Sequence, residues 1–378
     1  MSPAVPARPG RSRATVRRAR SRAAVLLPLL LALPLAACSG TSDPGPDATT
    51  APAPAALEPV LAEIAGGSAL DIGFAVSPER LDEPEYREIV DKHASLVVAE
   101  NVMKWETTEA ADDEWDFAEG DRLAEYARST GKKLYGHTLV WHSQLPAWVK
   151  ALDEDAMQEA MEDHVRTQAE HFRGQVFAWD VVNEAVDEDG SRRSDSPFQA
   201  TLGDDYIADA FEVAHEADPD AQLCYNDYDI EGVNAKSDGV YALVEDLLAR
   251  DVPIDCLGIQ GHLTAGKLPD DLQENIQRFV DLGLTVRITE LDIRVETPAS
   301  DEALAQQAED YASVATACLA VEGCLGLTVW GVTDRYSWIP MWFEGFGDAL
   351  LWDADYEPKP AFDALVEAVG KGRPGRTG

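Results

Sequence analysis

The chain has 378 residues and is strongly acidic, with 31 lysines and arginines against 69 aspartates and glutamates and a formal net charge of −38. Nucleic acids and anionic membrane surfaces carry charge of the same sign, so both are disfavoured as partners. The stretch 57–369 is long enough for a single large α/β domain, and no internal linker divides it.

The first 37 residues have the features expected of an export signal. The first 37 residues hold seven arginines and no acidic residue, and an apolar stretch broken only by prolines covers residues 23–37. This stretch is shorter than the ~20 residues that span a bilayer as a helix, so an uncleaved anchor is disfavoured. It closes as Leu-Ala-Ala-Cys at residues 35–38, which resembles a bacterial lipobox. We therefore expect a signal peptide over residues 1–37 and a lipid on Cys38. The alternative is ordinary cleavage beside an incidental cysteine.

Residues 38–56 are rich in Ser, Thr, Pro and Ala and predict a disordered tether. The adjacent Arg17 and Arg18 leave the export route open, because an arginine-rich leader contains such pairs by chance. We expect an exported protein, either a cell-surface lipoprotein or a secreted one, that contacts the membrane only through Cys38. Residues 370–378 are expected to form a flexible tail.

From residue 57 onward, the sequence repeats an amphipathic helix, a glycine and a short apolar strand. One such helix has Met157, Met161, Val165 and Phe172 at three-to-four spacing, as a helix packed on a sheet requires. The glycines that follow four of the helices are expected to adopt left-handed caps, at Gly131, Gly174, Gly283 and Gly323.

Eight strands are predicted in chain order, near residues 72–75, 96–99, 134–137, 176–182, 222–225, 256–260, 286–290 and 326–330. Eight alternating units in one domain predict a single (β/α)₈ TIM barrel of the α/β class. An open doubly wound sheet is the alternative, but no GxGxxG or P-loop motif marks a nucleotide site. In a barrel, the active site lies where the strands end.

Two glutamates lie at the ends of predicted strands, Glu184 in FAWDVVNEA (177–185) and Glu290 in LTVRITELD (284–292). Each alone is as compatible with a surface position as with a site. Two carboxyl groups facing each other across a cleft can serve as the acid/base and the nucleophile of glycoside hydrolysis. Cleaving an acetal needs both roles, and a nearby ionised carboxylate keeps its neighbour protonated.

Polar motifs follow seven of the predicted strands. They are ENVMKW (100–105), GHTLVWHSQLPAW (136–148), WDVVNEA (179–185), CYNDYDIEG (224–232), LGIQGHL (257–263), ITELDI (288–293) and TVWGVTDRYSW (328–338). Across residues 57–369, this ordered set resembles glycoside hydrolase family 10, the retaining endo-1,4-β-xylanases. One departure is Gly261, where the family commonly has a serine between the Gln and the His.

The resemblance implies a role for each matching residue. Glu184 would be the acid/base and Glu290 the nucleophile; Asn183 would hold the sugar 2-hydroxyl, and His262 and Asp292 would orient the nucleophile. The polar wall of the sugar sites would comprise Glu100, Asn101, Lys104, His137 and Gln144. Stacking platforms would be Trp141, Trp330 and Trp338, with Asn226, Tyr228 and Gln260 in support. Trp115, Trp179 and Trp352 are expected to serve packing.

Four cysteines remain if Cys38 carries the lipid, and an exported protein with an even number favours disulfides over a metal site. No CxxC or HExxH motif competes. The resemblance implies the pairs Cys224 with Cys256 and Cys318 with Cys324. His137, His142 and His262 are alternative metal ligands, but their neighbours fit sugar binding better. We expect neither a metal nor a cofactor.

The sequence therefore predicts a monomeric endo-1,4-β-xylanase that cleaves internal bonds of xylan and xylo-oligosaccharides with retention. A β-1,4-glucanase on the same barrel is an alternative, since the barrel and both glutamates would be shared. A glycan-binding surface lipoprotein without catalysis is another, although a pure binder need not keep both Glu184 and Glu290.

Overall fold

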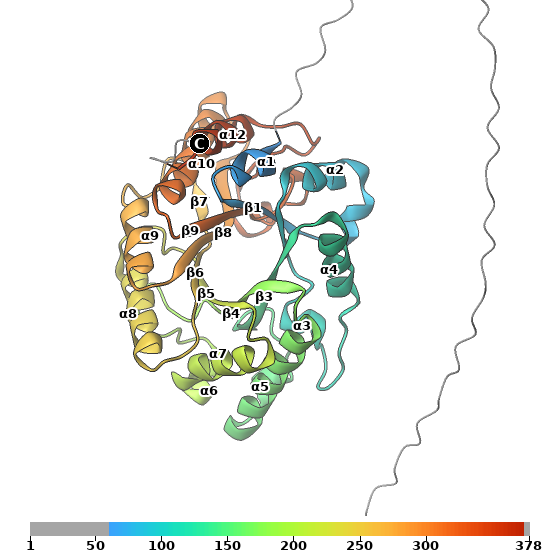
Figure 1. The fold of residues 1–378 in the computed structure, drawn as a ribbon, viewed down its shortest axis with the longest axis vertical. Coiled ribbons are helices and arrows are strands. Elements are labelled where there is room, and N and C mark those ends of the chain that lie inside the picture. The colour runs from blue at the N-terminus through green and yellow to red at the C-terminus, as the bar shows by residue number, and fades with distance from the viewer. Residues whose placement is uncertain (1–59, 374–378) are drawn as a thin grey trace, which may run out of the picture. The chain divides into compact units, whose positions relative to one another are not determined.

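A computed structural model describes residues 60–373, in which parallel strands close into a barrel surrounded by helices (Figure 1). The barrel strands are β1 (Asp71–Val76), β2 (Leu96–Ala99), β3 (Lys133–Trp141), β4 (Val176–Asn183), β5 (Gln222–Asp227), β6 (Cys256–Ile259), β8 (Thr285–Glu296) and β9 (Cys324–Val329). Each pairs in parallel with the next, and β9 pairs with both β8 and β1, which closes the ring. The predicted TIM barrel and all eight strands are confirmed.

Helices lie outside the ring in the figure, as the alternating pattern predicts. The longer helices are α2 (Pro84–His93), α4 (Ala118–Thr130), α5 (Glu154–His171), α7 (Asp205–Ala217), α8 (Ala235–Ala249), α9 (Leu272–Asp281), α10 (Asp301–Ala320) and α12 (Pro360–Gly370), and the short α1 (Leu61–Gly66) precedes β1. Shorter elements lie in the loops: η1 (Pro78–Asp82), α3 (Trp105–Thr108), η2 (Val149–Ala151), α6 (Pro197–Leu202), β7 (His262–Thr264), η3 (Asp334–Tyr336), α11 (Ile339–Trp342) and β10 (Phe346–Gly347).

Local chemistry explains where several helices begin and end. The Asp153 side chain accepts a hydrogen bond from the backbone of Ala156 and so caps the start of α5. Gly131, Gly174 and Gly283 have the expected positive φ angles, of 72°, 71° and 99°. The expectation for Gly323 was wrong: α10 ends earlier, and Gly323 does not adopt the left-handed conformation.

Gly323 instead serves close packing, because a Cβ there would lie 2.7 Å from the side chain of Val280.

Successive side chains of β2 belong in turn to two separate hydrophobic layers. In β2, Val97 and Ala99 belong to the large core beneath the helices, whereas Leu96 and Val98 belong to a smaller cluster with Ala75, Tyr135, Ala178, Cys224, Cys256 and Trp330. Successive side chains of a strand point to opposite faces, so the smaller cluster fills the inside of the barrel.

Both disulfides implied by the resemblance are present. Cys224 and Cys256 are register partners on the adjacent strands β5 and β6, and their disulfide lies on the inner face of the barrel. Cys318 and Cys324 join the end of α10 to the start of β9. The expected signal peptide (1–37), the lipid on Cys38 and the tether (38–56) lie outside the described residues, as do residues 374–378 of the tail. Within 60–373, no helix is long and apolar enough to cross a bilayer.

Candidate active site

The two glutamates occupy the carboxyl end of the barrel. Glu184 directly follows β4, and Glu290 lies within β8 and is 4% exposed. The register slips by one residue beside each of them, between Ile288 and Leu291 on β8 and between Asp180 and Val182 on β4. Such β-bulges redirect side chains next to active sites. Strands that elsewhere alternate regularly thus turn their polar side chains into the barrel mouth.

Three side chains surround the carboxylate of Glu290. Asn226 Nδ2 donates to Oε1 at 2.7 Å, and His262 Nε2 lies 3.2 Å from Oε2. His137 Nδ1 is farther away, 3.9 Å from Oε1. Burial alone would raise the pKa of Glu290, but His137, His262 and Lys104 outweigh it and bring the pKa below its usual value. Glu290 is therefore held ionised, as a nucleophile requires.

His262 links Glu290 to a second buried carboxylate. Its Nδ1 lies 2.9 Å from Asp292 Oδ2, which also accepts a hydrogen bond of 2.8 Å from Trp338 Nε1. Burial would lower the pKa of His262, but the charges and hydrogen bonds of Asp292 and Glu290 raise it to about 10. The imidazole is thus positively charged at neutral pH and donates from both nitrogens. The structure thus places His262 between Glu290 and Asp292.

Glu184 accepts hydrogen bonds from three donors. Trp141 Nε1 lies 2.8 Å from Oε2, while Gln260 Nε2 and Asn183 Nδ2 lie 3.0 and 3.2 Å from Oε1. The backbone of Glu184 is left-handed, with φ of 59°. A non-glycine residue adopts this conformation only at a cost, and such residues gather at functional sites. The half-buried carboxyl group is thereby aimed into the barrel mouth.

Arg193 holds the backbone around Glu184, although sequence reasoning missed it. Its Nε donates to the carbonyl of Glu184 at 2.5 Å, and its Nη2 donates to Val186 O at 3.2 Å and to the Tyr228 hydroxyl at 2.9 Å. Arg193 lies in the loop after β4, outside the quoted motifs, and no strand-end pattern marks it. Arg193 thereby connects Tyr228, one of the expected supporting residues, to the backbone of Glu184.

A chain of amides connects the two glutamates. Asn226 Nδ2 donates to both Glu290 and Asn183 Oδ1, and Gln260 Nε2 donates to both Asn183 Oδ1, at 3.3 Å, and Glu184. The hydroxyl of Thr289 donates to Asn226 Oδ1 at 2.6 Å, which fixes the orientation of that amide. Thr289 was missed as well, although it stands beside Glu290 in the motif.

His137 is oriented from inside the barrel by Asp180, another residue that the motif contained but sequence reasoning did not select. Asp180 Oδ2 lies 2.8 Å from His137 Nδ1, and Asp180 Oδ1 accepts from the Tyr135 hydroxyl at 2.7 Å. Burial raises the pKa of Asp180, against the opposing effect of His137. A polar residue inside an apolar strand was the signal that could have identified it.

His137, Asp180 and Glu290 also lie close enough together to hold a metal ion, with one ligand atom of each within 4.8 Å of the others. Their contacts already explain the cluster, because His137 Nδ1 faces Asp180 and Glu290 Oε1 accepts from Asn226. The hydrogen bonds of these three side chains therefore account for their closeness, and a bound cation is not needed to explain it.

Lys104 is the centre of the expected polar wall. Its ammonium donates to Asn101 Oδ1 at 2.9 Å and to Gln144 Oε1 at 2.7 Å. Burial lowers the pKa of Lys104, against the charges of Glu290 and Glu100, and burial raises the pKa of Glu100. The amide nitrogen of Gln144 also donates to Asn101 at 3.3 Å. The structure thus places Lys104 with Asn101 and Gln144, while His137 lies beside Trp330 and near Glu290.

The three predicted platforms stand around these groups. Lys104 Nζ lies 5.0 Å from the ring centre of Trp141 and 5.9 Å from that of Trp330. Trp338 meets His262 edge to face, with ring centres 4.9 Å apart. The indole nitrogens of Trp141 and Trp338 are engaged by Glu184 and Asp292, so these rings are fixed as well as apolar. Apolar ring faces can stack on a sugar, and the polar side chains beside them can form hydrogen bonds with its hydroxyl groups.

Residues 60–368 match the family model described as Glycosyl hydrolase family 10. The chain belongs to this family. An endo-1,4-beta-xylanase from Agaricus bisporus is 47% identical over 72% of this chain and 82% of its own length. Endo-1,4-beta-xylanase B from Thermotoga neapolitana is 39% identical over 79% of this chain and 88% of its own. Family membership confirms the resemblance that the motifs indicated.

Solved structures agree with the sequence relatives. Xylanase 10B from Thermotoga petrophila RKU-1, solved in complex with xylobiose, has a TM-score of 0.81 and 39% sequence identity, and covers 84% of this chain and 99% of its own. Native xylanase 10B from Thermotoga maritima has a TM-score of 0.80 and 40% identity, over 82% of this chain and 98% of its own. The family fold therefore extends over the whole described barrel.

Proposed function

We propose that this family 10 glycoside hydrolase is an endo-1,4-β-xylanase that cleaves xylan and xylo-oligosaccharides with retention of configuration. The observation that carries the proposal is the setting of Glu290, an ionised carboxylate held by Asn226 and a charged His262 and connected to Glu184 through amides. The relatives named as xylanases and the neighbour solved with xylobiose support xylan as the substrate.

In the first step, a carboxylate oxygen of Glu290 attacks the anomeric carbon while the bond from that carbon to the leaving oxygen breaks. Glu184 gives its proton to the leaving oxygen, so the leaving chain departs as an alcohol. His262 and Asn226 keep the attacking carboxylate in place. Asn183, with its Nδ2 beside Glu184, is positioned to donate a hydrogen bond to the sugar 2-hydroxyl.

In the second step, the ionised Glu184 takes a proton from water while the water oxygen attacks the anomeric carbon. The bond to Glu290 breaks, and the carboxylate is regenerated with the product in its original configuration. Trp141 and Gln260 hold the Glu184 carboxyl group in the same position for both steps. The regenerated carboxylate of Glu290 is again stabilised by the positive charge of His262.

Two other functions share parts of this site. A β-1,4-glucanase would use the same glutamates, but the relatives described above are named as xylanases, which favours xylan. A non-catalytic glycan binder would need neither the charged His262 nor its contact with Glu290. Initial rates on xylan and on a soluble cellulose, with product sizing, test all three: we expect xylo-oligosaccharides from internal cleavage and far slower release from the cellulose.

We further propose that the enzyme is exported, acts as a monomer and is anchored through a lipid on Cys38. The arginine-rich leader and the LAAC sequence support export and anchoring. Cys38→Ser should move the protein out of the membrane fraction or stall its processing. Equal partitioning of wild type and variant into the aqueous phase of a detergent extraction would contradict anchoring.

A further inference from the structure

Met341 and Trp342, two neighbouring apolar residues of α11, are exposed to solvent. Within residues 60–373, the exposed large hydrophobic side chains are Val233, Met341 and Trp342, and the last two are 81% and 74% exposed. A single exposed apolar residue is ordinary, but an adjacent Met and Trp leave a contiguous apolar surface in water. Indole faces are used where a partner has both apolar and polar surfaces, as a sugar ring has.

The backbone that carries this surface is held firmly. Ile339, at the start of α11, is fully buried, and the guanidinium carbon of Arg294 lies 4.0 Å from the ring centre of Phe343. Beyond the helix, β10 pairs antiparallel with β8, with Phe346 opposite Glu296. Trp342 is therefore displayed from an ordered loop, which reduces the entropy lost when a ligand binds.

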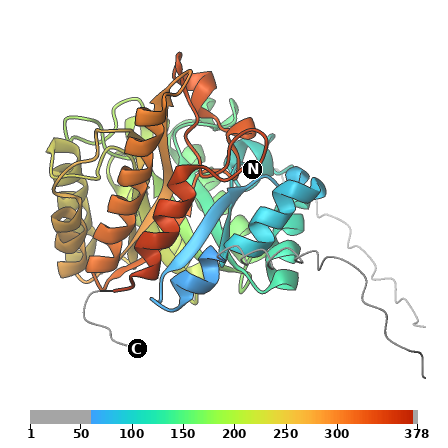
Figure 2. The ribbon, with the colours of Figure 1, turned by 90° about the horizontal axis from the view of Figure 1, so that it is seen from above.

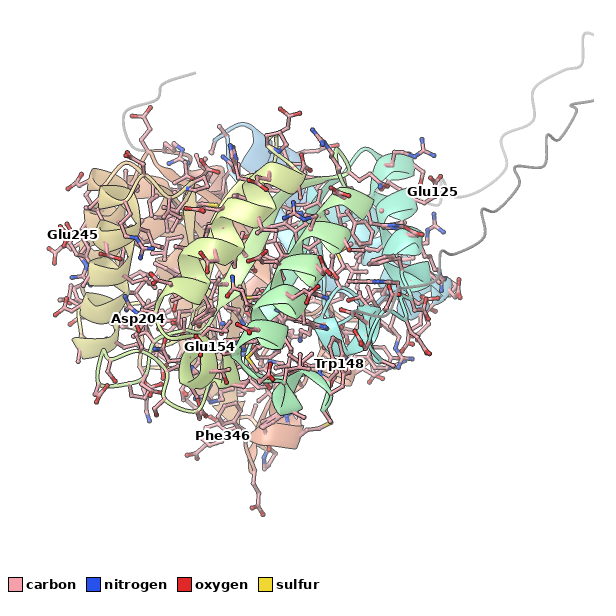
Figure 3. All side chains as sticks on the ribbon, turned by 90° about the horizontal axis from the view of Figure 1, so that it is seen from below. Glu125, Trp148, Glu154, Asp204, Glu245 and Phe346 are labelled. Carbon is pink, nitrogen blue, oxygen red and sulfur yellow. A yellow bond between two sulfur atoms is a disulfide. The ribbon has the colours of Figure 1, made fainter. Side chains whose placement is uncertain are left out.

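This surface adjoins the catalytic groups. The ring of Trp342 lies 6.4 Å from that of Trp338, which donates to Asp292, the partner of His262. In Figure 2, the orange-red segment that contains α11 rises above the carboxyl end of the barrel. In Figure 3, which shows the molecule turned over, Phe346 lies farther out than Trp148 and Glu154 on the same side.

We propose that Met341 and Trp342 form a sugar-binding surface that holds a further unit of the polysaccharide chain, outside the sites that contact Glu184 and Glu290. The proposal rests on the proposed xylanase function. One indole face matches one pyranose ring, and the surface continues the line of aromatic rings that begins at Trp338. Its contribution is to affinity for long substrates, because it touches none of the reacting groups.

Charge and size argue against other occupants. The chain has a formal net charge of −38, and Glu344 beside the surface is exposed, so an anionic bilayer would be repelled. Two side chains are also far fewer than the roughly 20 residues per partner of a stable protein interface. A neutral polysaccharide meets neither obstacle.

The test compares a long and a short substrate. With the full chain, Trp342→Ala should lower kcat/KM on soluble xylan about tenfold, through KM, because one aromatic contact is removed. On an aryl β-xylobioside, which is too short to leave the catalytic sites, kcat/KM should stay within about twofold. Trp342→Phe should restore most of the loss on xylan. Val233→Ala, which removes another exposed apolar side chain, is the control and should match wild type on both substrates.

Each other outcome overturns the inference. Unchanged kinetics on xylan would show that Trp342 binds no sugar, and an equal loss on both substrates would show that it acts through Trp338. A change in oligomeric state on a sizing column, or in vesicle binding, for Trp342→Ala would assign the surface to a second copy or to a membrane. If wild type itself fails on xylan, the proposed function fails, and this result is distinct from all of the others.

Discussion

His262 faces Glu290 with Nε2 3.2 Å from the carboxylate, and on its other side Nδ1 lies 2.9 Å from Asp292. The positive charge of His262 between the two buried carboxylates keeps Glu290 ionised. Asp292 fixes the orientation of the imidazole through the hydrogen bond to Nδ1. Because His262 lies between the two carboxylates, a change at Asp292 should also affect Glu290.

Asp292→Asn should lower kcat on xylan on the order of 100-fold, which corresponds to ~2.7 kcal/mol in activation free energy. The amide removes the largest of the charges that raise the pKa of His262, and an imidazole that is less strongly held in its charged form lowers the pKa of Glu290 less. The acidic limb of kcat/KM against pH should therefore move to higher pH. Asp310→Asn, which changes a buried aspartate bonded to the backbone of Gly266, is the control and should leave the profile in place.

His262 should also make stability depend on pH. Its folded-state pKa of about 10 lies above the ordinary histidine value of about 6.5, so the stabilisation is fully present below about pH 6.5 and is lost as the pH rises towards about 10. We expect the difference in unfolding free energy between wild type and His262→Gln to be larger at pH 6 than at pH 10. Denaturant titrations at the two values measure it, and an equal difference at both would contradict a charged imidazole.

Arg193→Met should affect the acid/base more than the nucleophile, because Arg193 holds the left-handed backbone of Glu184. Misplacing the proton donor should cost about 100-fold on xylan. Formation of the glycosyl-enzyme from an aryl xylobioside with an activated leaving group needs little acid help, so its burst should slow far less. Arg192→Met, which changes the neighbouring half-buried arginine, is the control. A uniform loss on both substrates would mean that Arg193 only supports the fold.

Cys224 and Cys256 should contribute substantially to stability from inside the barrel. Replacing both by alanine should lower the free energy of unfolding by about 3 to 4 kcal/mol, as the chain-entropy model gives for a loop of this length. Denaturant unfolding of the oxidised protein and the double variant measures the change. Peptide mapping without reduction checks the pairing, and free thiols at these positions would contradict it.

The position of the candidate site could be read from the sequence, although the strand that carries Glu290 continues to Glu296. Glu184 and Glu290 close apolar runs, and the topology of a barrel brings every strand end to one mouth. Residues that act through others were harder to find. Thr289 on β8 orients Asn226, and Asp180 on β4 orients His137; the partners of both residues became clear only from side-chain geometry.

Loops account for the remaining differences. Arg193 follows a turn whose path the sequence does not specify, and it donates to the hydroxyl of Tyr228. Gly323 was predicted as a cap because it follows a helical pattern, but the close approach of Val280 explains the glycine instead. In both cases tertiary packing decides what the local pattern leaves open.

The measurement that tests the central claim most directly is the configuration of the product formed with azide by two variants. On an activated aryl xylobioside, Glu184→Ala should accumulate the glycosyl-enzyme, and azide should release it as the β-glycosyl azide, because attack on the Glu290 ester inverts its α configuration. Glu290→Ala should be inactive on its own, and any azide adduct should be α, formed by direct displacement. A β-azide from Glu290→Ala, or an α-azide from Glu184→Ala, would contradict the assignment of the two roles.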